Sequence, residues 1–253
     1  MLTIINSTSL IGINGYKVEV QVDVGNNLDK WDIVGMPDIS IRESRERVRT
    51  AIRNSGYSIN GKKILINLAP AEIKKEGSVF DLAIAVGILT SIGGVQNSQI
   101  DKYAFLGELS LDGKVNSISG ILPMCIELNR LGIKKVILPK SSAIEASIVK
   151  GLEVYGVENL REAVDFLNGD IQIEKSETDI EKIMNHPQNT LIDFDEVKGQ
   201  ENVKRAMEIA AAGGHNCLLI RKPRFRKNND CKKNNNNSAR YEFWRNARSY
   251  ENT

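Results

Sequence analysis

The chain has 253 residues, with 34 Lys and Arg, 32 Asp and Glu, and 41% hydrophobic residues. That length suits one full domain and part of another. Residues 221–253 hold ten basic and three acidic residues, so residues 1–220 hold 24 basic and 29 acidic residues and are mildly acidic. The body of the chain therefore lacks the overall basic character that is typical of a nucleic-acid-binding protein.

The cysteines and the start of the chain indicate the compartment. Cys125, Cys217 and Cys231 lie in unrelated contexts, which predicts neither a disulfide framework nor a metal site. The N-terminal segment has no basic leader, and no stretch approaches the ~20 apolar residues that a membrane span requires. We therefore expect a reduced, cytoplasmic protein with no membrane partner.

The first third of the chain predicts strands around one helix. Residues 16–24, YKVEVQVDV, alternate between polar and apolar side chains, which is typical of a half-buried strand. A helix is expected at residues 41–55, because Val48, Ala51 and Ile52 share one side of it. The other strands expected here are residues 33–35 and 63–68.

The middle of the chain predicts alternating helices and strands. An apolar helix is expected at residues 79–92, with Leu82, Ala85, Val86 and Leu89 at helical spacing. The Asp-Gly pair at 112–113 predicts a hairpin over residues 107–115. The other expected elements are strands at 104–106, 135–138 and 152–157 and helices at 120–131, 141–150 and 160–168. Residues 1–169 therefore predict an α/β or α+β layered domain.

A linker and a second domain are expected after this point. Residues 170–190 are polar and aperiodic, which predicts a linker with a short helix possible at 179–184. In the second domain, residues 191–220, a helix at 203–212 precedes an apolar strand at 216–220. Such a strand normally leads into a glycine-rich phosphate loop. Here it is followed by Arg-Lys-Pro-Arg at 221–224.

Four motifs point to a single family. They are KEGSVFDLA at 75–83, GE with GKV within 107–115, LGIKKVILP at 131–139, and DFDEVKGQENVKRAMEIAAAGGHNCLLI at 193–220. Together they resemble the Mg-chelatase-like AAA+ ATPases of the ComM/YifB type over about residues 1–220. The resemblance implies a Lon-protease-like, ribosomal-S5-domain-2-like fold for residues 1–169, also related to the C-terminal domain of the repair protein RadA. It implies an incomplete AAA+ P-loop module for residues 191–220.

The resemblance also implies a function for an intact family member. Such a protein is expected to use ATP and Mg²⁺ in a homo-oligomeric ring and to act on DNA, through branch migration and recombination during DNA uptake in competence. The edge of its nucleotide pocket corresponds here to Val197, Gly199, Gln200, His215 and Asn216. Magnesium insertion into a porphyrin is suggested by the family's name only.

The relation to Lon raises the hypothesis of a protease. A Lon-type enzyme needs a serine activated by a lysine. In the resemblance, the serine position falls on Val79 and the lysine position on about Leu122, and neither side chain can act as nucleophile or base. Ser78 stands one position early and is interpreted as a helix N-cap. We therefore expect no catalytic residue, no metal site and no proteolysis.

Other polar residues receive structural interpretations. Residues 74–76, Lys-Lys-Glu, are expected in a solvated turn. Five arginines between positions 42 and 53 are interspersed with Glu43 and Glu46, which favours a salt-bridged exposed helix face over a DNA-contacting stripe. His186 is expected to be a linker residue, and Cys217 a core residue.

Three hypotheses compete for residues 221–253: a natural disordered tail, a nucleic-acid-binding arm, and translation in a shifted reading frame. Synonymous codons for residues 221–233 can be chosen so that the same bases, read one base later, encode Gly-Asn-Pro-Gly-Ser-Gly-Lys-Thr-Met-Ile-Ala-Lys. This is a complete phosphate loop, so the frameshift hypothesis is favoured. It predicts a truncated ATPase module without Walker A or Walker B motifs and without ATP hydrolysis. The alternative is a stand-alone interaction or DNA-binding module built on the first domain.

Overall fold

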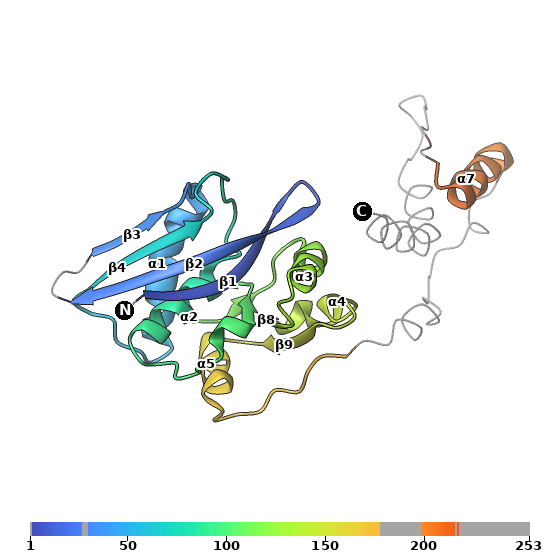
Figure 1. The fold of residues 1–253 in the computed structure, drawn as a ribbon. Helices are drawn as coiled ribbons and strands as arrows, with labels where there is room; N and C mark the ends of the chain where they lie inside the picture. Colours follow the sequence, from blue (N-terminus) through green and yellow to red (C-terminus); the bar gives the residue numbers. More distant parts are fainter. Residues whose placement is uncertain (1, 27–29, 178–198, 216, 218–253) are drawn as a thin grey trace. The chain divides into compact units, whose positions relative to one another are not determined.

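The computed structural model describes residues 2–26, 30–177, 199–215 and 217 (Figure 1). The chain divides into two compact units, residues 1–179 and 180–253. Each unit is considered by itself. The helix expected at 179–184 lies outside the described residues.

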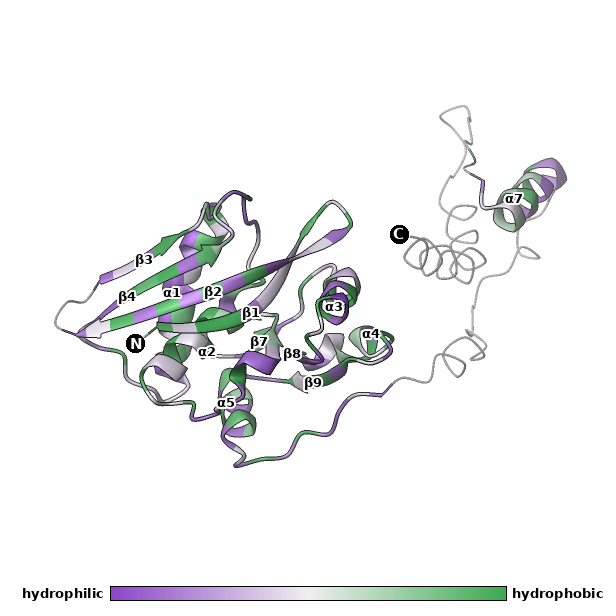
Figure 2. Cartoon of the chain, in the orientation of Figure 1, coloured by the Kyte–Doolittle hydropathy of each residue, from purple (hydrophilic) through white to green (hydrophobic). Residues whose placement is uncertain are grey.

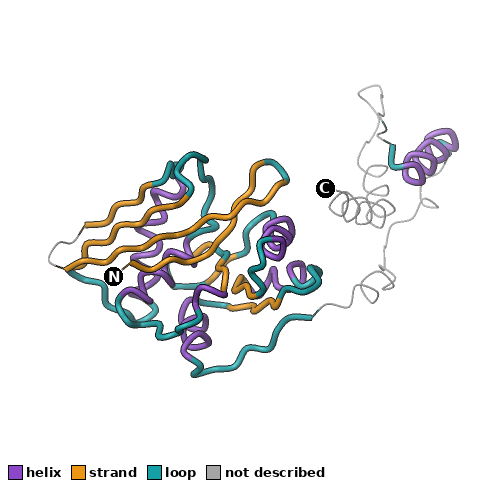
Figure 3. Tube along the Cα trace, viewed as in Figure 1, coloured by secondary structure: helices purple, strands orange, loops and turns teal. Residues whose placement is uncertain are grey.

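The strands of the first unit are orange in Figure 3. Seven of them form one mixed sheet in the order β3-β4-β2-β1-β5-β8-β9. Pairing is antiparallel for β1–β2 and β2–β4, and parallel for the other neighbours. A separate two-stranded sheet pairs β6 with β7. The strands are β1 (Leu2–Ile11), β2 (Asn14–Asn26), β3 (Lys30–Val34), β4 (Lys62–Ala69), β5 (Tyr103–Phe105), β6 (Glu108–Leu109), β7 (Val115–Asn116), β8 (Lys135–Pro139) and β9 (Glu153–Val157).

Five α-helices accompany these strands. Helix α2 packs against β1 and β2, α1 packs against α2, and α3 also contacts β1 and β2. The helices are α1 (Ile39–Asn54), α2 (Asp81–Ser91), α3 (Ile121–Arg130), α4 (Ala143–Ala146) and α5 (Leu160–Asn168), with 3₁₀ turns at Ile100–Lys102 and Lys140–Ser142. This mixed α/β architecture confirms the predicted fold class.

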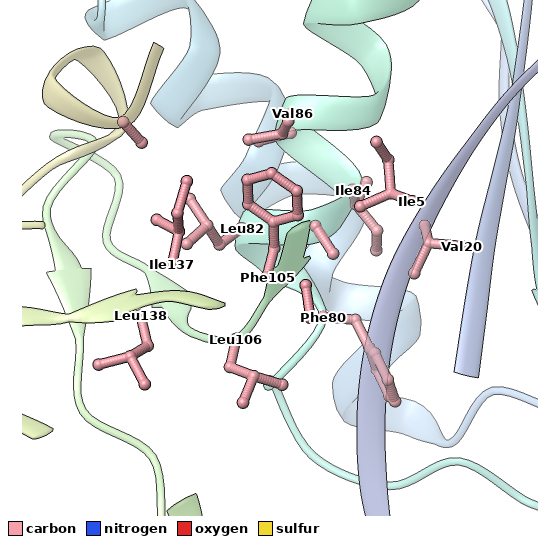
Figure 4. Close-up of a cluster of buried hydrophobic side chains, with 14 of the residues drawn as sticks. Ile5, Val20, Phe80, Leu82, Ile84, Val86, Phe105, Leu106, Ile137 and Leu138 are labelled. Atoms are coloured by element: carbon pink, nitrogen blue, oxygen red, sulfur yellow. The ribbon is translucent and has the colours of Figure 1, made fainter. Parts of the chain in front are cut away.

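The core is built from the apolar faces that the sequence places at strand and helix spacing. Along β2, Val18, Val20 and Val22 are fully buried, while the residues between them are more exposed, an alternation that Figure 2 shows as changing colour. All residues of α2 from Asp81 to Leu89 are buried, so this helix lies inside the domain. Figure 4 shows part of the resulting cluster, with Phe105 beside Leu82 and Val86.

A glycine allows this central helix to approach the sheet closely. A Cβ added at Gly87 would lie 2.8 Å from Val22 Cγ2 and 3.2 Å from Ile5 Cγ1. Contacts below 3.0 Å require a neighbour to shift, and both neighbours are buried core residues. The absence of a side chain at this position therefore sets the distance between α2 and the sheet.

The sheet has a narrow connection between its antiparallel and parallel halves. Strands β1 and β2 pair over ten positions, whereas β1 pairs with β5 only at Asn6 and Ala104. Side chains supply further bonds there: Asn6 Nδ2 donates to the Asp101 carbonyl at 2.7 Å, and Ser7 Oγ to the Phe105 carbonyl at 2.9 Å. Polar side chains thus replace ladder hydrogen bonds at this connection.

Most expected elements are confirmed with boundaries shifted by a few residues, including α1, α2, the hairpin of β6 and β7, and α5. Two expectations differ from the structure. Strand β1 was not assigned from the sequence, and the helix expected at 141–150 is only the short α4, after which tighter turns take over: the amides of Ile148 and Val149 bond to carbonyls three residues earlier.

The described part of the second unit is one helix, α7 (Glu201–Gly213), which confirms the helix expected at 203–212. Met207 and Ala210 are its buried residues. The strand expected at 216–220 falls outside the described residues except for Cys217. In the described ranges of both units, no helix has the length and apolar character needed to cross a membrane.

Candidate functional site

A cavity of about 450 Å³ lies in the first unit, where β1, the loop before α2, strand β6 and the start of α3 meet. Its wall combines two carboxylates, four serines and four larger apolar side chains. The lining residues are Ser9, Leu10, Glu76, Gly77, Ser78, Val79, Glu108, Ser117, Ile118, Ser119 and Met124. Cavities of this size hold small molecules or parts of a peptide.

The loop before α2 is fixed against β6 by backbone hydrogen bonds. Gly107 N–H donates to the Val79 carbonyl, and Leu82 N–H donates to the Gly107 carbonyl, both at 3.0 Å. Gly107 has φ 154°, and a Cβ there would lie 2.7 Å from Val115 Cγ1. A side chain at Gly107 would therefore force apart the strands that hold Glu108 in the cavity wall.

A second glycine shapes the opposite wall. Gly120 adopts a left-handed conformation, φ 78°, at the N-cap of α3. A Cβ at this position would clash with Leu10 Cδ1. Helix α3 therefore begins directly beside the end of β1, and Met124 in its first turns reaches the cavity.

Ser78 and Glu108 are hydrogen-bonded to each other across the cavity wall, with Ser78 Oγ donating to Glu108 Oε2. The interpretation of Ser78 as a helix N-cap is wrong. Helix α2 begins at Asp81, and its N-cap Phe80 has no side-chain capping bond. The Ser78 side chain is directed toward β6 instead, where it donates to the carboxylate of Glu108, and a charged acceptor makes a stronger hydrogen bond than a neutral one.

The two positions that correspond to a Lon-type dyad are occupied by aliphatic side chains. Val79 lines the cavity and is otherwise buried. Leu122 is partly buried in the first turn of α3 and does not line the cavity. The lysine nearest in sequence to Ser78, Lys75, is fully buried and donates through Nζ to the Pro70 carbonyl, so it is not available to activate a serine.

The expectation of a solvated turn at residues 74–76 is wrong for its middle residue. Lys74 and Glu76 are exposed and form an ion pair at 2.7 Å, but Lys75 points inward and has no exposed surface. Burial lowers the pKa of Lys75 because it penalises the charged amine. The backbone of Lys75 also bonds to Met36 and Asp38, which ties this loop to the start of α1.

Asp81, at the start of α2, is fully buried and forms an ion pair with the partly buried Arg47. Asp81 Oδ2 accepts from Arg47 Nε at 2.9 Å and from the Leu109 amide at 3.3 Å. Arg47 Nη2 also donates to Ser44 Oγ at 2.8 Å. Burial raises the pKa of Asp81 above its ordinary value, while the bonds from Arg47 and Ser44 act in the opposite direction. The pair joins α1, α2 and β6.

The arginine-rich helix α1 carries charge mostly on its exposed side, as expected. Arg45 pairs with Glu46 at 3.1 Å, and both are exposed. Arg47 is the exception, because it turns toward Asp81. The start of the helix is capped by Asp38, whose carboxylate accepts from Ile41 N at 2.8 Å and from Gly77 N at 3.1 Å.

The predicted edge of the nucleotide pocket is only partly described. Gly199 and Gln200 adopt left-handed conformations, φ 71° and 65°, immediately before α7. His215 is exposed just after this helix, with its ring against Gly213. Val197, Asn216 and His186 lie outside the described residues. Cys217 is exposed, so the expectation of a core position is wrong.

The cavity residues Ser9, Ser117 and Ser119 were not predicted from the sequence. Ser9 lies in β1, Ser117 and Ser119 lie in the loop between β7 and α3, and no local pattern marks any of them. Glu108 belongs to a recognised motif, but the motif alone gives it no role. In the described part of the chain, no group of three or more His, Cys, Asp or Glu side chains is arranged to hold a metal ion.

Comparisons with known proteins identify the family. The family model described as subunit ChlI of Mg-chelatase matches residues 18–142, and the one described as magnesium chelatase, subunit ChlI, matches residues 193–229. YifB of Escherichia coli strain K12 is 36% identical over 224 residues, which cover 88% of this chain and 43% of that protein. The chain is a ComM/YifB-like member of the Mg-chelatase ChlI family.

The chain is also similar to a competence protein and, over a shorter stretch, to a Lon protease. Competence protein ComM of Haemophilus influenzae is 34% identical over 224 residues, 88% of this chain and 44% of that protein. Lon protease 2 of Bacillus subtilis is 31% identical over 183 residues, 64% of this chain and 32% of that protein. The chain thus spans less than half the length of the YifB and ComM relatives that it matches.

Proposed function

We propose that this ComM/YifB-like chain neither hydrolyses ATP nor cleaves peptides, although the family resemblance implies that an intact member uses ATP and Mg²⁺ in a ring that acts on DNA. The observation that carries the proposal is the absence of glycine from residues 215–253. A phosphate loop of the G-x-x-x-x-G-K-[ST] type needs glycines, because its backbone amides approach the phosphates closely. The second family match, residues 193–229, covers the segment where this loop belongs.

The residues present in that segment do not replace the loop. Lys227 is followed by Asn228, whereas a phosphate loop places Ser or Thr there to hold Mg²⁺. Arg224 and Arg226 stand among bulky side chains rather than glycines. A basic segment of this kind attracts phosphate by charge but does not present the converging amides that position it for hydrolysis.

The proposal is tested by ATP turnover. The purified chain is compared with a chain whose reading frame is shifted by one base after codon 220, so that Gly-Asn-Pro-Gly-Ser-Gly-Lys-Thr and the rest of the shifted frame follow Ile220. Turnover and fluorescent-ATP binding are expected only in the restored chain. Turnover by the original chain that Lys227→Ala abolishes would contradict the proposal. Stop codons early in the shifted frame of the gene would exclude the frameshift itself.

A second role, a binding module without hydrolytic activity, is favoured by the cavity of the first unit. The cavity is open to ligands, yet its wall offers no activated nucleophile: Val79 occupies the serine position and Ser78 is bonded to a carboxylate. Binding without cleavage is what this combination supports. Degradation of casein by the purified chain would contradict this role, provided that Ser78→Ala abolishes it.

A further inference from the structure

The charge of the cavity indicates which ligands it can accept. Of the described residues that line it, two are acidic, Glu76 and Glu108, and none is basic. Glu76 is exposed and paired with Lys74 at 2.7 Å. Glu108 is half-buried, and no basic side chain of the described residues forms an ion pair with it. The cavity therefore holds one carboxylate whose charge is not compensated by a direct contact.

The hydrogen-bonding groups of the wall keep several acceptor sites that no donor of the described residues fills, on Glu108 and on the hydroxyls of Ser117 and Ser119. Ser78 Oγ gives its proton to Glu108, and a carboxylate accepts about four hydrogen bonds, so Glu108 keeps free acceptor sites. Ser117 and Ser119 form no side-chain hydrogen bonds within the described part of the chain. A ligand that supplies several N–H donors satisfies these groups together.

The remaining wall is apolar and completes the description of the ligand. Leu10, Val79, Ile118 and Met124 line the cavity on the sides between the polar groups. An alkyl stem packs favourably against such side chains, while a charged head reaches the carboxylate. Anionic phosphates are disfavoured, because no cation in the wall compensates them and Glu108 repels them.

We infer that this cavity binds a lysine or arginine side chain of a basic peptide segment, with Glu108 as the principal partner of the cationic head. Arginine fits best, because its five N–H donors match a carboxylate and neighbouring hydroxyls at once. This inference rests on the proposed role as a binding module. It is independent of the proposed lack of ATP hydrolysis, because the cavity lies wholly in the first unit.

The test measures peptide binding to the purified full chain by calorimetry and by NMR chemical-shift changes. The probes are acetyl-Gly-Arg-Gly-amide, its Lys counterpart, and the Gln and Glu counterparts as controls. We expect the Arg peptide to bind at least tenfold more tightly than the Gln peptide, with shifts at Ser78, Glu108 and Ser119. Its affinity is expected to fall as salt concentration rises, since screening weakens the ion pair.

Variants separate this site from adventitious binding to surface charge. Glu108→Gln is expected to lower the affinity for the Arg peptide at least fivefold, and Ser119→Arg to abolish binding by supplying the cation itself. Glu145→Gln removes an exposed carboxylate on α4 that does not line the cavity, and it is expected to change nothing. Thermal unfolding of each variant confirms that the fold is kept.

The inference is overturned if the Gln peptide binds as tightly as the Arg peptide, or if Glu108→Gln binds like the unaltered chain. Equal or tighter binding of free arginine amide or spermidine overturns the assignment of a peptide, because a small cation then suffices. Competition by duplex DNA at the same resonances overturns the predicted charge selectivity. If peptide binds and ATP is turned over, the binding inference stands and the proposal of an inactive ATPase fails.

Discussion

Asp81 and Glu108 are two carboxylates held around the same short strand, β6, in opposite environments. Asp81 is fully buried and accepts hydrogen bonds from Arg47 and from the Leu109 amide. Glu108, the residue before Leu109, faces the open cavity and accepts from Ser78. The two carboxylates thus involve adjacent residues of β6, Asp81 through the Leu109 amide and Glu108 through its own side chain. One charge holds the elements together, and the other is left for a ligand.

The largest expected effect comes from removing the buried charge. Asp81→Ala leaves the partly buried Arg47 guanidinium without its partner and the Leu109 amide without an acceptor. We expect the free energy of unfolding in urea to fall by about 3 kcal/mol, since breaking one side of a buried pair costs that much. Glu108→Ala is the matched control, with an expected loss below about 0.5 kcal/mol, as for an ordinary surface substitution. Equal losses would contradict the assigned roles.

Gly107 is the next residue to test, because it precedes Glu108 and its carbonyl accepts from Leu82 N–H, next to Asp81. Gly107→Ala places a Cβ 2.7 Å from Val115 Cγ1 at a φ of 154°. We expect a loss of about 2 kcal/mol, from backbone strain and overpacking together. Gly93→Ala is a suitable control, because Gly93 also has positive φ but open space around it, and its expected loss is about 1 kcal/mol. The same urea series measures both, and a smaller loss at Gly107 would contradict the close packing described.

The two serines beside the carboxylates allow a finer comparison. Ser44 is buried and accepts from Arg47, so Ser44→Ala is expected to cost about 1 kcal/mol. Ser78→Ala removes the bond to Glu108 at the cavity wall, where water can take its place, and is expected to cost less than about 0.5 kcal/mol. If Ser78→Ala is the more costly of the two, the cavity is less open than the structure indicates.

The smallest effect concerns reactivity rather than stability. Burial raises the pKa of the Cys125 thiol to about 12, so this thiol stays protonated and unreactive at pH 8. Cys217 is exposed and serves as the internal comparison. In a Cys231→Ser chain, iodoacetamide is expected to modify Cys217 alone until urea unfolds the protein. Rapid native labelling of Cys125, located by mass spectrometry, would show that α3 opens readily.

Sequence patterns predicted the elements whose stabilisation is local. The spacing of the valines in β2 and of the apolar residues in α1 predicts their burial, and the Asp112–Gly113 pair predicts the turn. Strand β1 was not predicted because its centre, Asn6 to Ser9, consists of polar residues only and shows no alternation of polar and apolar side chains. These side chains are nevertheless buried, and Asn6 and Ser7 bond to carbonyls almost 100 residues away. Tertiary context overrides the local pattern there.

The candidate site shows the same division. The motif at residues 75–83 predicted that this loop matters and that Val79 cannot act as a nucleophile. It did not predict that Lys75 is buried or that Ser78 turns toward Glu108, because both depend on chain segments far from the motif. The cavity needs four separate segments to meet, and single serines such as Ser117 and Ser119 carry no signal of that in the sequence.

The narrow connection between β1 and β5 has a consequence for how the domain opens. With one paired position, supplemented by side-chain bonds from Asn6 and Ser7, it is the part of the seven-stranded sheet with the least backbone pairing. Amides of β5 are therefore expected to exchange with deuterium through smaller fluctuations than amides of the long β1–β2 ladder. Ser9 and Leu10 of the cavity wall belong to β1. A local separation of β1 from β5 would therefore widen the cavity without unfolding either half of the sheet.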